Sequence, residues 1–533
     1  MKSVHFARIF VLATAIVTLL PAVANGANIL FFMGLASHSH RVALQPLAEK
    51  LAGTGHKVTF LTYMKSEKPH PNITEFFPEA ATKLMSDQLD SLSMESINGR
   101  LKQKYFDPFI DPRKLWPLIL SGVEMTLINS DFQNWLNTTH FDLIIYDSPM
   151  KEIAVGIAYK MKAKVILFQT TATQHMFDFD MFGLPSESSW LPDWTAGSEY
   201  PLVPHHFQYA YNALWWYYSY TWHYLPKLNE ILAKLYGEDL PPIDELIRSK
   251  VDLVLVNEHF SSNFPRSLPP YVVPVGGMHC RESNGVLPDE MEAFLKSKDK
   301  FIFMSFGSAI KVSDLPKETQ KMLFEAVESM TDTNVLWKWE GEIPENLPKN
   351  VFAKNWFPQQ DVLAHPKCKG FLTQGGGMSF QQAAFHGVPV IVVPIWGDQT
   401  FVAQSAVYQG NGIHLELFDI NKETLTTAFR ELLDNEKYYK TAKEISKRFK
   451  ERPLSAVDTA AWWTEYVLRH DMAHLKSPAI HQYWWQRRLL DFWATVFGVI
   501  LITAFLTIKI SVVLARNVRA LAGTSHVEKT KLS

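Results

Sequence analysis

Short apolar runs alternate with helix-patterned segments along most of the chain, and this alternation restricts the fold more than any other feature. The first unit begins with the apolar run at residues 28–33, continues with apolar residues at helical spacing between Val42 and Leu51, and ends with the β-rich run at residues 57–62. A strand, a helix and a second strand in this order give a parallel sheet. The same unit recurs at Phe141–Asp147, Lys151–Lys162 and Lys164–Gln169. The first half of the chain is therefore predicted to be a doubly wound α/β domain.

A second series of apolar runs predicts a second parallel sheet. These runs are Phe301–Ser305, Asn334–Trp339, Val351–Trp356, Gly370–Thr373 and Val388–Pro394. We expect the hinge at Gly276-Gly277, after the proline-rich stretch 264–274, and so domains at 25–275 and 276–490. Two such domains that face each other leave a cleft, and ligands of doubly wound sheets bind beyond the carboxyl ends of the strands.

Length, charge and cysteine content exclude several other classes of protein. A chain of 533 residues is too long for one core. The net charge is −2, from 52 basic and 54 acidic residues, so nothing indicates a nucleic-acid partner. Cys280 and Cys368 are the two cysteines, which excludes a cysteine-rich metal site and leaves open one disulfide or two free thiols.

The amino terminus is typical of a secretory signal peptide. Lys2 and Arg8 are basic, residues 9–20 are uncharged and apolar, and small residues at 22–24 form a cleavage site. We expect residues 1–24 to be removed. The mature chain then enters the secretory lumen, where the sequons at Asn72 and Asn137 are expected to be glycosylated.

The carboxyl terminus is predicted to cross a membrane once, at residues 491–515. Apart from Lys509, residues 492–515 carry no charge, and these roughly 24 residues would extend about 36 Å as a helix, enough for a bilayer core. Basic residues follow the span at Arg516, Arg519, Lys529 and Lys531, against Arg487 and Arg488 before it. The positive-inside rule then gives a type I protein with a cytoplasmic tail at 516–533.

Lys529 and Lys531 lie at the fifth and third positions from the end of that tail. This spacing resembles the dilysine signal that retains type I proteins in the endoplasmic reticulum. We therefore expect both domains on the lumenal side of that membrane.

A run of glycines indicates where an anion would bind. Gly375, Gly376 and Gly377 follow an apolar run and open a helix-patterned segment. Glycines let the backbone approach a ligand closely, and the first turn of a helix offers free N–H groups and a positive dipole end. A phosphate group fits such a site.

The glycine run is part of a longer pattern that resembles the signature of the UDP-glycosyltransferase family, glycosyltransferase family 1. The matching residues are Trp356-Phe357-Pro358-Gln359, His365, Thr373-Gln374-Gly375-Gly376-Gly377-Met378-Ser379, Gln382-Ala383, Gly387-Val388-Pro389 and Asp398-Gln399. The resemblance covers nearly the whole chain, including the signal peptide and the terminal span. It implies a GT-B fold in which two Rossmann-like domains face a cleft and the second binds a UDP-sugar.

The resemblance also assigns roles in donor binding. It implies that Trp356 stacks on uracil, that Gln359 hydrogen-bonds the base, and that residue 382 faces the ribose. The diphosphate would be bound by Ser308, Gln374, Gly375, Gly376, Gly377 and Ser379. The sugar hydroxyls would be bound by Asp398 and Gln399. Three positions depart from the family pattern, because Gln374, Gln382 and Val402 replace its histidine, glutamate and asparagine.

A histidine and an aspartate in the first half fit the family's catalytic pair. His40 lies sixteen positions before His56 of the Gly55-His56-Lys57-Val58-Thr59 motif, and this is the spacing of the catalytic histidine in the family. His38 does not fit that spacing. A neutral histidine can accept the proton of an attacking hydroxyl near neutral pH. Asp147 ends a predicted strand and matches the aspartate that would orient this base.

These features predict an inverting, metal-independent transfer of a hexose to a small lipophilic acceptor, as in detoxification or metabolite conjugation. Glucose is preferred over glucuronate, because no basic residue can be assigned to a donor carboxylate. The Asp-Phe-Asp triplet at 178–180 is expected to be a solvated loop and not a metal site. No cofactor beyond the UDP-sugar co-substrate is expected, and a homo-oligomer remains open.

Two alternatives remain. Gln374 and Gln382 favour a pseudoenzyme that binds ligand without turnover. The aromatic cluster at 207–224 suits a membrane surface or an apolar pocket, and so also favours transfer to a lipid, although it is equally consistent with an ordinary core helix.

Overall fold

The computed structural model describes residues 26–34, 37–64, 69–105, 107, 111–148, 151–171, 191, 206–308 and 310–529. The chain divides into two compact units, 1–476 and 477–533. The predicted signal peptide, the Asp-Phe-Asp triplet and Lys531 lie outside the described residues.

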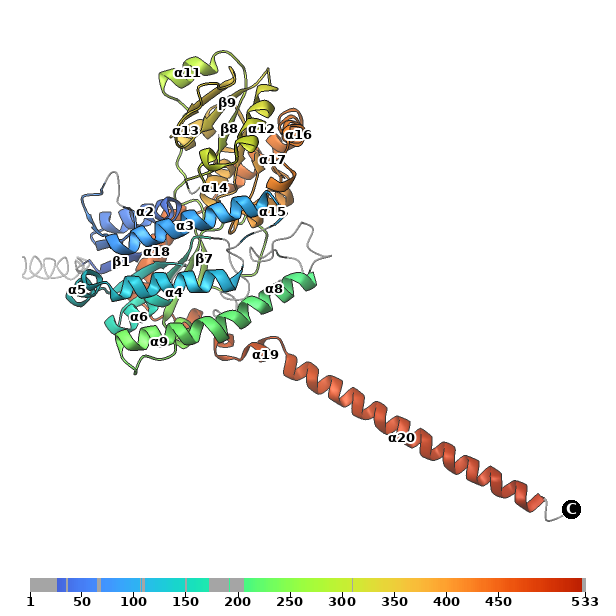
Figure 1. Ribbon diagram of the computed structural model, residues 1–533. Helices are drawn as coiled ribbons and strands as arrows, with labels where there is room; N and C mark the ends of the chain where they lie inside the picture. Colours follow the sequence, from blue (N-terminus) through green and yellow to red (C-terminus); the bar gives the residue numbers. More distant parts are fainter. Residues whose placement is uncertain are drawn as a thin grey trace, which may run out of the picture. The chain divides into compact units, whose positions relative to one another are not determined.

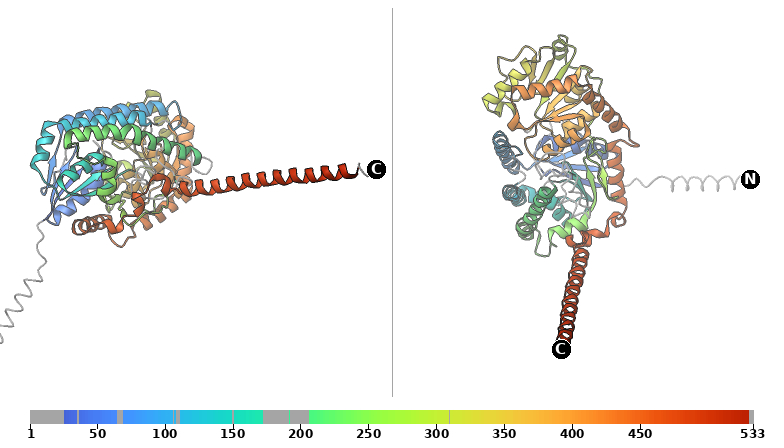
Figure 2. Two further views of the ribbon diagram at one scale, coloured as in Figure 1. Left: turned by 90° about the horizontal axis from the view of Figure 1, so that it is seen from below. Right: turned by 90° about the vertical axis from the view of Figure 1, so that its right-hand side faces the viewer.

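The first sheet has seven parallel strands in the order β3-β2-β1-β4-β5-β6-β7 (Figure 1). The strands are β1 (Asn28–Phe32), β2 (Lys57–Leu61), β3 (Ile73–Phe76), β4 (Leu143–Asp147), β5 (Lys164–Gln169), β6 (Val251–Val256) and β7 (Val272–Pro274). Central strands such as β4 are buried at every residue, because helices cover both faces of the sheet (Figure 2). This burial is why they appear in the sequence as continuous apolar runs.

The helices of the first half are α2 (His38–Gly53), α3 (Glu79–Arg100), α4 (Pro112–Ile128), α5 (Ser130–Thr138), α6 (Lys151–Met161), α8 (His206–Ser219), the π-helical turn η4 (Tyr220–Tyr224), α9 (Leu225–Tyr236) and α10 (Ile243–Lys250). Helix α2 begins at His38, so His40 lies in its first turn and not in the preceding loop. Asn72 and Asn137, the predicted glycosylation sites, are both exposed.

The second sheet has six parallel strands in the order β10-β9-β8-β11-β12-β13. These are β8 (Phe301–Ser305), β9 (Asn334–Lys338), β10 (Val351–Lys354), β11 (Cys368–Thr373), β12 (Val390–Val392) and β13 (Gly412–His414). Its helices are α11 (Asp289–Leu295), α12 (Lys317–Glu328), α13 (Gln359–Ala364), α14 (Gly377–His386), α15 (Gln399–Gln409), α16 (Lys422–Asp434) and α17 (Glu436–Lys450). Cys280 and Cys368 are both free thiols.

Every strand predicted from the sequence is present, with ends shifted by a few residues. Four strands were not predicted, namely β3, β6, β7 and β13. Strand β7 lies at the end of the proline-rich stretch 264–274, where we predicted no strand. It forms the edge of the first sheet. Proline is tolerated there, because the N–H group that Pro274 lacks is not needed to pair with a further strand.

Two helices pack on the half of the chain to which they do not belong in sequence. Helix α18 (Ala456–Arg469) follows the second sheet, yet it places Ala460 and Val467 in the core of the first. Helix α3 belongs to the first half, but Ile97 near its end lies in the core of the second sheet, beside α15 (Figure 1). Helices α3 and α18 thus each pack against the half of the chain to which they do not belong in sequence.

The second unit contains α19 (Trp484–Arg487) and α20 (Leu490–Lys529). Residues Leu490–Leu521 of α20 are long and apolar enough to cross a membrane, and none of the apolar window is buried in the structure. The span predicted at 491–515 falls within this helix, and Lys529 is its last residue.

Candidate active site

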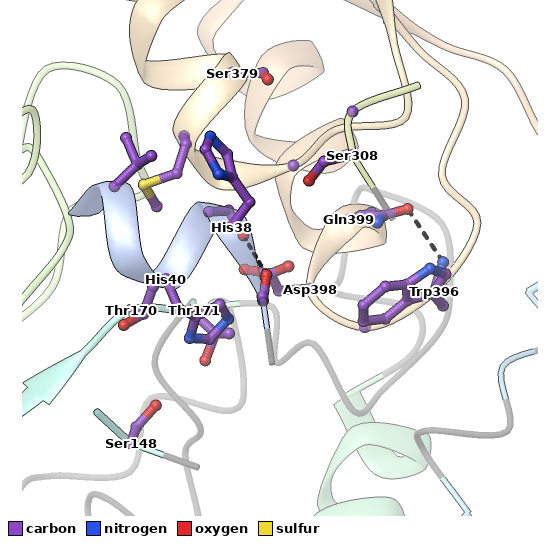
Figure 3. A pocket seen from close by; sticks show the side chains of 18 of the residues that line it. His38, His40, Ser148, Thr170, Thr171, Ser308, Ser379, Trp396, Asp398 and Gln399 are labelled. Carbon is purple, nitrogen blue, oxygen red and sulfur yellow. Dashed lines mark hydrogen bonds between the residues drawn. The ribbon is translucent and has the colours of Figure 1, made fainter. Parts of the chain in front are cut away.

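A cavity of about 500 Å³ lies where strands of both sheets reach their carboxyl ends. Residues from both halves of the chain line it, and Figure 3 shows several of them. All of the predicted catalytic and donor-binding residues line this cavity except Asp147 and Gly375. The sequence pattern therefore selected residues that the fold brings together.

His40 and Asp147 form a buried hydrogen-bonded pair. The Nδ1 atom of His40 donates to Asp147 Oδ2 at 2.5 Å, and the carboxylate is fully buried at the end of β4. The hydroxyl of Thr170, just after β5, donates to the other carboxylate oxygen. With both oxygens of Asp147 engaged, the imidazole is fixed by Nδ1 and its Nε2 is the atom available to a ligand.

Two carboxylates influence the basicity of His40. Burial lowers the pKa of the imidazole, but the charge and hydrogen bond of Asp147, together with the charge of Asp398, outweigh it. The pKa of His40 is therefore raised above its ordinary value. His40 is poised to accept a proton and to be stabilised as imidazolium.

The glycine run forms the start of α14, as its sequence predicted. Gly376 is the N-cap residue and has no side chain to cap the helix, and the first helical bond runs from Phe380 N–H to Gly376 O at 3.0 Å. Within the described part of the chain, the N–H groups of Gly377, Met378 and Ser379 have no hydrogen-bond acceptor. These groups and the helix dipole form a site for an anion.

Gln374 places a neutral carboxamide beside this helix start. Its Oε1 accepts a hydrogen bond from the Thr373 hydroxyl at 3.0 Å. Its Nε2 lies against Gly307, where an added Cβ would be only 2.2 Å away. The glycine leaves room for the amide, which offers N–H donors to a phosphate but no charge.

The residues predicted to bind the nucleoside form a second group, on the loop before α13 and on α13 and α14. Gln359 Nε2 donates to Ser379 Oγ at 3.0 Å and to Gln382 Oε1 at 2.7 Å. The Trp356 ring is 62% exposed. Lys338 Nζ lies 5.5 Å from its centroid, and the His38 ring from the first half lies 5.8 Å away. Trp356 thus presents an open aromatic face in the cavity.

The loop between β12 and α15 brings Asp398 and Gln399 to the same cavity. Gln399 Oε1 accepts hydrogen bonds from the backbone N–H of Ile395 at 2.9 Å and of Trp396 at 3.2 Å, and Figure 3 shows it beside Trp396. A Cβ on Gly377 would lie 4.0 Å from Asp398 Oδ2. Asp398 therefore lies next to the anion site. Ser308, after β8, also lines the cavity.

The aromatic cluster at 207–224 divides between two surroundings. Trp216, Tyr220 and Tyr224 are buried and line the cavity with Trp116, which stacks on Tyr224 at 4.6 Å. Trp215, Tyr218 and Trp222 are exposed. The inner residues give the cavity an apolar wall, and Tyr220 donates a hydrogen bond to the buried Glu152.

Sequence reasoning missed several residues of the site, among them Thr170, His38, Lys338, Trp396 and Trp116. Thr170 directly follows a predicted strand and Lys338 is the last residue of β9, so both lie at the carboxyl ends of predicted strands, where ligands bind. His38, Trp396 and Trp116 are brought in by helices and a loop whose positions depend on the tertiary structure.

Comparison with known proteins agrees with this geometry. The model for the family "UDP-glucoronosyl and UDP-glucosyl transferase" matches residues 30–524. UDP-glucosyltransferase 2 of Dactylopius coccus is 30% identical over 90% of this chain and 92% of its own, and UDP-glucuronosyltransferase 1-2 of Rattus norvegicus is 24% identical over 91% of each.

Two solved structures share the fold at low sequence identity. The glycosyltransferase of kitacinnamycin superposes with a TM-score of 0.55 at 16% identity, over 83% of this chain and 99% of its own. LpCGTa, solved in complex with UDP, gives 0.53 at 16% identity, over 84% and 100%. The two facing α/β sheets are thus a GT-B fold. By its sequence, its fold and the residues gathered in its cavity, this chain is a UDP-glycosyltransferase and belongs to the family of UDP-glucuronosyl and UDP-glucosyl transferases.

Proposed function

We propose that this enzyme transfers glucose from UDP-glucose to the hydroxyl of a small lipophilic acceptor, with inversion and without a metal ion. The observation on which this rests is the juxtaposition of the His40–Asp147 pair with the open start of α14 in one cavity. One provides a base and the other an anion site, the two functions that sugar transfer from a nucleoside diphosphate requires.

The base acts through Nε2 of neutral His40. An acceptor hydroxyl donates its proton to this atom as its oxygen attacks the anomeric carbon, and the bond from that carbon to the UDP oxygen breaks on the opposite face. An α-linked donor therefore gives a β-glycoside. Asp147 stabilises the resulting imidazolium and keeps Nδ1 protonated, so that Nε2 is the basic nitrogen.

Negative charge develops on the phosphates of UDP as the bond breaks, and these phosphates would lie at the start of α14. The N–H groups of Gly377, Met378 and Ser379 and the amide of Gln374 can donate hydrogen bonds to these phosphates, with Ser308 beside them. Preorganised donors at the place where charge develops can supply the stabilisation that a metal ion supplies elsewhere. This supports a metal-independent reaction.

The nucleoside would lie against Trp356, with uracil stacked on the ring and hydrogen-bonded by Gln359. Gln382 would accept a bond from a ribose hydroxyl. Asp398 would bind the sugar hydroxyls, because it lies close to both the anion site and His40, and Gln399, the next residue, lines the same cavity and would bind them as well.

Two observations favour glucose over glucuronate. Arg281 and Lys338 line the cavity, but each already forms an ion pair, with Asp361 and Glu340 respectively. Lys151 also lines the cavity, but it begins α6, on the side that we assign to the acceptor. The Asp398 carboxylate would also repel a second carboxylate nearby. The Dactylopius coccus relative, named as a glucosyltransferase, agrees with this choice.

The acceptor would bind the wall formed by Trp116, Trp216, Tyr220 and Tyr224. These aromatic side chains favour an apolar molecule. We further propose that the protein is a type I membrane protein of the endoplasmic reticulum with both domains in the lumen. The apolar helix Leu490–Leu521, the signal-like amino terminus and the lysines near the end of the tail support this.

Calorimetric titration of the full chain in detergent with UDP, UDP-glucose and UDP-glucuronate tests the donor site. Trp356→Ala should weaken the Kd of UDP about 5- to 150-fold, because base stacking on an aromatic side chain is worth about 1–3 kcal/mol. Trp462→Ala, which removes an exposed tryptophan of α18 outside the cavity, is the matched control and should bind UDP normally.

Turnover is measured on the same samples as UDP release with a panel of aryl and alkyl alcohols. Glucose transfer that exceeds glucuronate transfer supports the proposal. Failure of the folded protein to bind any of the three nucleotides would refute it, and nucleotide binding without UDP release would favour a pseudoenzyme.

A further inference from the structure

Arg100, the last residue of α3, is buried in the half of the protein opposite to its own. Its side chain is 1% exposed. Ile97, one turn earlier, lies in the second core, with Met94 and Leu101 packed beside it. The end of α3 therefore enters the sugar-donor half of the enzyme, although the helix starts in the other half.

Three nitrogens of the Arg100 guanidinium donate hydrogen bonds around the loop that bears Asp398 and Gln399. Nε donates to Ile395 O at 3.0 Å, before these residues, and Nη2 donates to Thr400 Oγ1 at 2.8 Å, directly after them. Nη1 donates to Glu416 Oε2 at 3.1 Å. The guanidinium thus links both ends of the loop to the carboxylate of Glu416.

Glu416 is itself fixed by other groups. It accepts hydrogen bonds from His414 Nε2 at 2.8 Å and from the backbone N–H of Tyr105 at 3.2 Å. Burial raises the pKa of Glu416, but the bond from His414 and the charge of Arg100 outweigh it, so the pKa is lowered and the carboxylate is charged. Both side chains of the Arg100–Glu416 ion pair are buried, and each is also hydrogen-bonded to further groups that fix its position.

A second contact from the same segment reaches the middle of the loop. The N–H of Gly397 donates to Asp107 Oδ2 at 2.6 Å. Within the loop, Gln399 Oε1 accepts hydrogen bonds from the backbone N–H groups of Ile395 and Trp396. At the start of this loop the Val393 N–H donates to Thr373 O of β11 at 2.9 Å, and beyond Val393 the bonds from Arg100, Asp107 and Gln399 are those that hold the loop.

We propose that Arg100 is a positioning residue for the donor sugar: by joining Ile395, Thr400 and Glu416 from the other half of the protein, it holds Asp398 and Gln399 against the sugar hydroxyls. This inference rests on the proposed function. Arg100 lines no part of the cavity and touches no reacting atom, so it acts through the loop. Lysine cannot replace it, because one ammonium group cannot reach three acceptors that the planar guanidinium bonds in different directions.

Arg100→Lys tests the proposal by separating nucleotide binding from sugar recognition. The Kd of UDP, which carries no hexose, should stay within about twofold of wild type. The ratio of kcat/KM for UDP-glucose to that for its C4 epimer UDP-galactose should fall at least about tenfold, because the loop no longer holds the groups that discriminate the hydroxyls.

Lys104→Ala is the matched control. Lys104 pairs with Asp419 at 2.6 Å and so also joins the segment after α3 to the second half, but this pair is exposed, unlike the buried pair of Arg100 and Glu416. This variant should keep both the UDP affinity and the sugar preference. If Arg100→Lys fails to fold, Thr400→Val decides, since it removes only the Nη2 bond and should lower the sugar preference in the same direction.

The outcomes distinguish this inference from the function on which it rests. A wild-type enzyme that uses no UDP-hexose would refute the proposed function. An active wild type with unchanged sugar preference in folded Arg100→Lys, or in Thr400→Val, would overturn the positioning role. Equal loss of UDP affinity and of turnover with both sugars would show a merely structural role and overturn it as well.

Discussion

Replacement of Asp147 by asparagine should remove most of the activity while leaving the fold intact. Asparagine has the same shape, and its Oδ1 and Nδ2 can still face His40 and Thr170. The lost quantity is the negative charge that stabilises imidazolium. A hydrogen bond to a charged group is worth about 1.5–3 kcal/mol, so kcat/KM should fall about 10- to 150-fold from this loss alone. A flipped amide would place the proton on Nε2 of His40 and remove the base altogether.

The pH dependence of kcat/KM tests the Asp147→Asn substitution in a second way. The pKa of His40 is raised in the wild type, so kcat/KM for a neutral alcohol acceptor should decline on the acid side with a midpoint above the ordinary histidine value. Removal of the Asp147 charge lowers the pKa of His40, and the midpoint should move to lower pH. UDP release from UDP-glucose with benzyl alcohol, measured from pH 5 to 9, tests both statements; the range is chosen to bracket the ordinary value of about 6.5.

An acceptor that is already ionised provides the control. A phenol with an electron-withdrawing substituent loses its proton near neutral pH and needs no base, so Asp147→Asn and His40→Ala should retain more activity with it than with benzyl alcohol. Equal loss with both acceptors, or an unchanged acid limb in Asp147→Asn, would refute the assignment of His40 as base and Asp147 as its partner.

Two further changes test the anion site. Gly375→Ala should lower the thermal stability and weaken UDP binding, because φ is +92° and the new Cβ would lie 2.6 Å from Val392 Cγ1; strain and overpacking together cost about 2–4 kcal/mol. Gly410→Ala, with φ of +76° and only an ordinary contact at 4.0 Å from Thr441 Cγ2, is the control that isolates the strain. Gln374→His combined with Gln382→Glu should lower the KM for UDP-glucose by up to about 30-fold, at about 1 kcal/mol for each restored charge. A KM that stays the same would show that the neutral amides are not the weak point of donor binding.

Local chemistry is why much of the fold could be predicted from the sequence. Parallel strands such as β4 and β8 are buried on both faces, so they appear as unbroken apolar runs, and the helices between them have their own period. Strand β7 escaped prediction because it has three residues and ends in proline, which resembles a linker unless the neighbouring strand is known.

The site was predictable to the extent that its residues are close in sequence or follow strands. The glycines at 375–377 lie at a helix start, as their place after an apolar run predicted, and His40 and Asp147 meet at one edge of a parallel sheet. Thr170 lies at the same edge, and its position after a predicted strand pointed to that edge, but not to a contact with Asp147. The position of Trp356 beside His38 depended on how the two halves face each other.

By itself, then, the sequence determined the two parallel sheets, the apolar terminal helix and the residue types of the donor site, because each depends on a periodicity or a spacing within about 40 residues. Only the tertiary structure decided that α18 returns to the first core and that Arg100 enters the second half. Arg100 meets Glu416 across 316 positions of the chain. In the sequence an arginine at the end of a helix resembles an ordinary partner of the helix dipole. Its role follows from contacts that exist only after both halves have folded and docked.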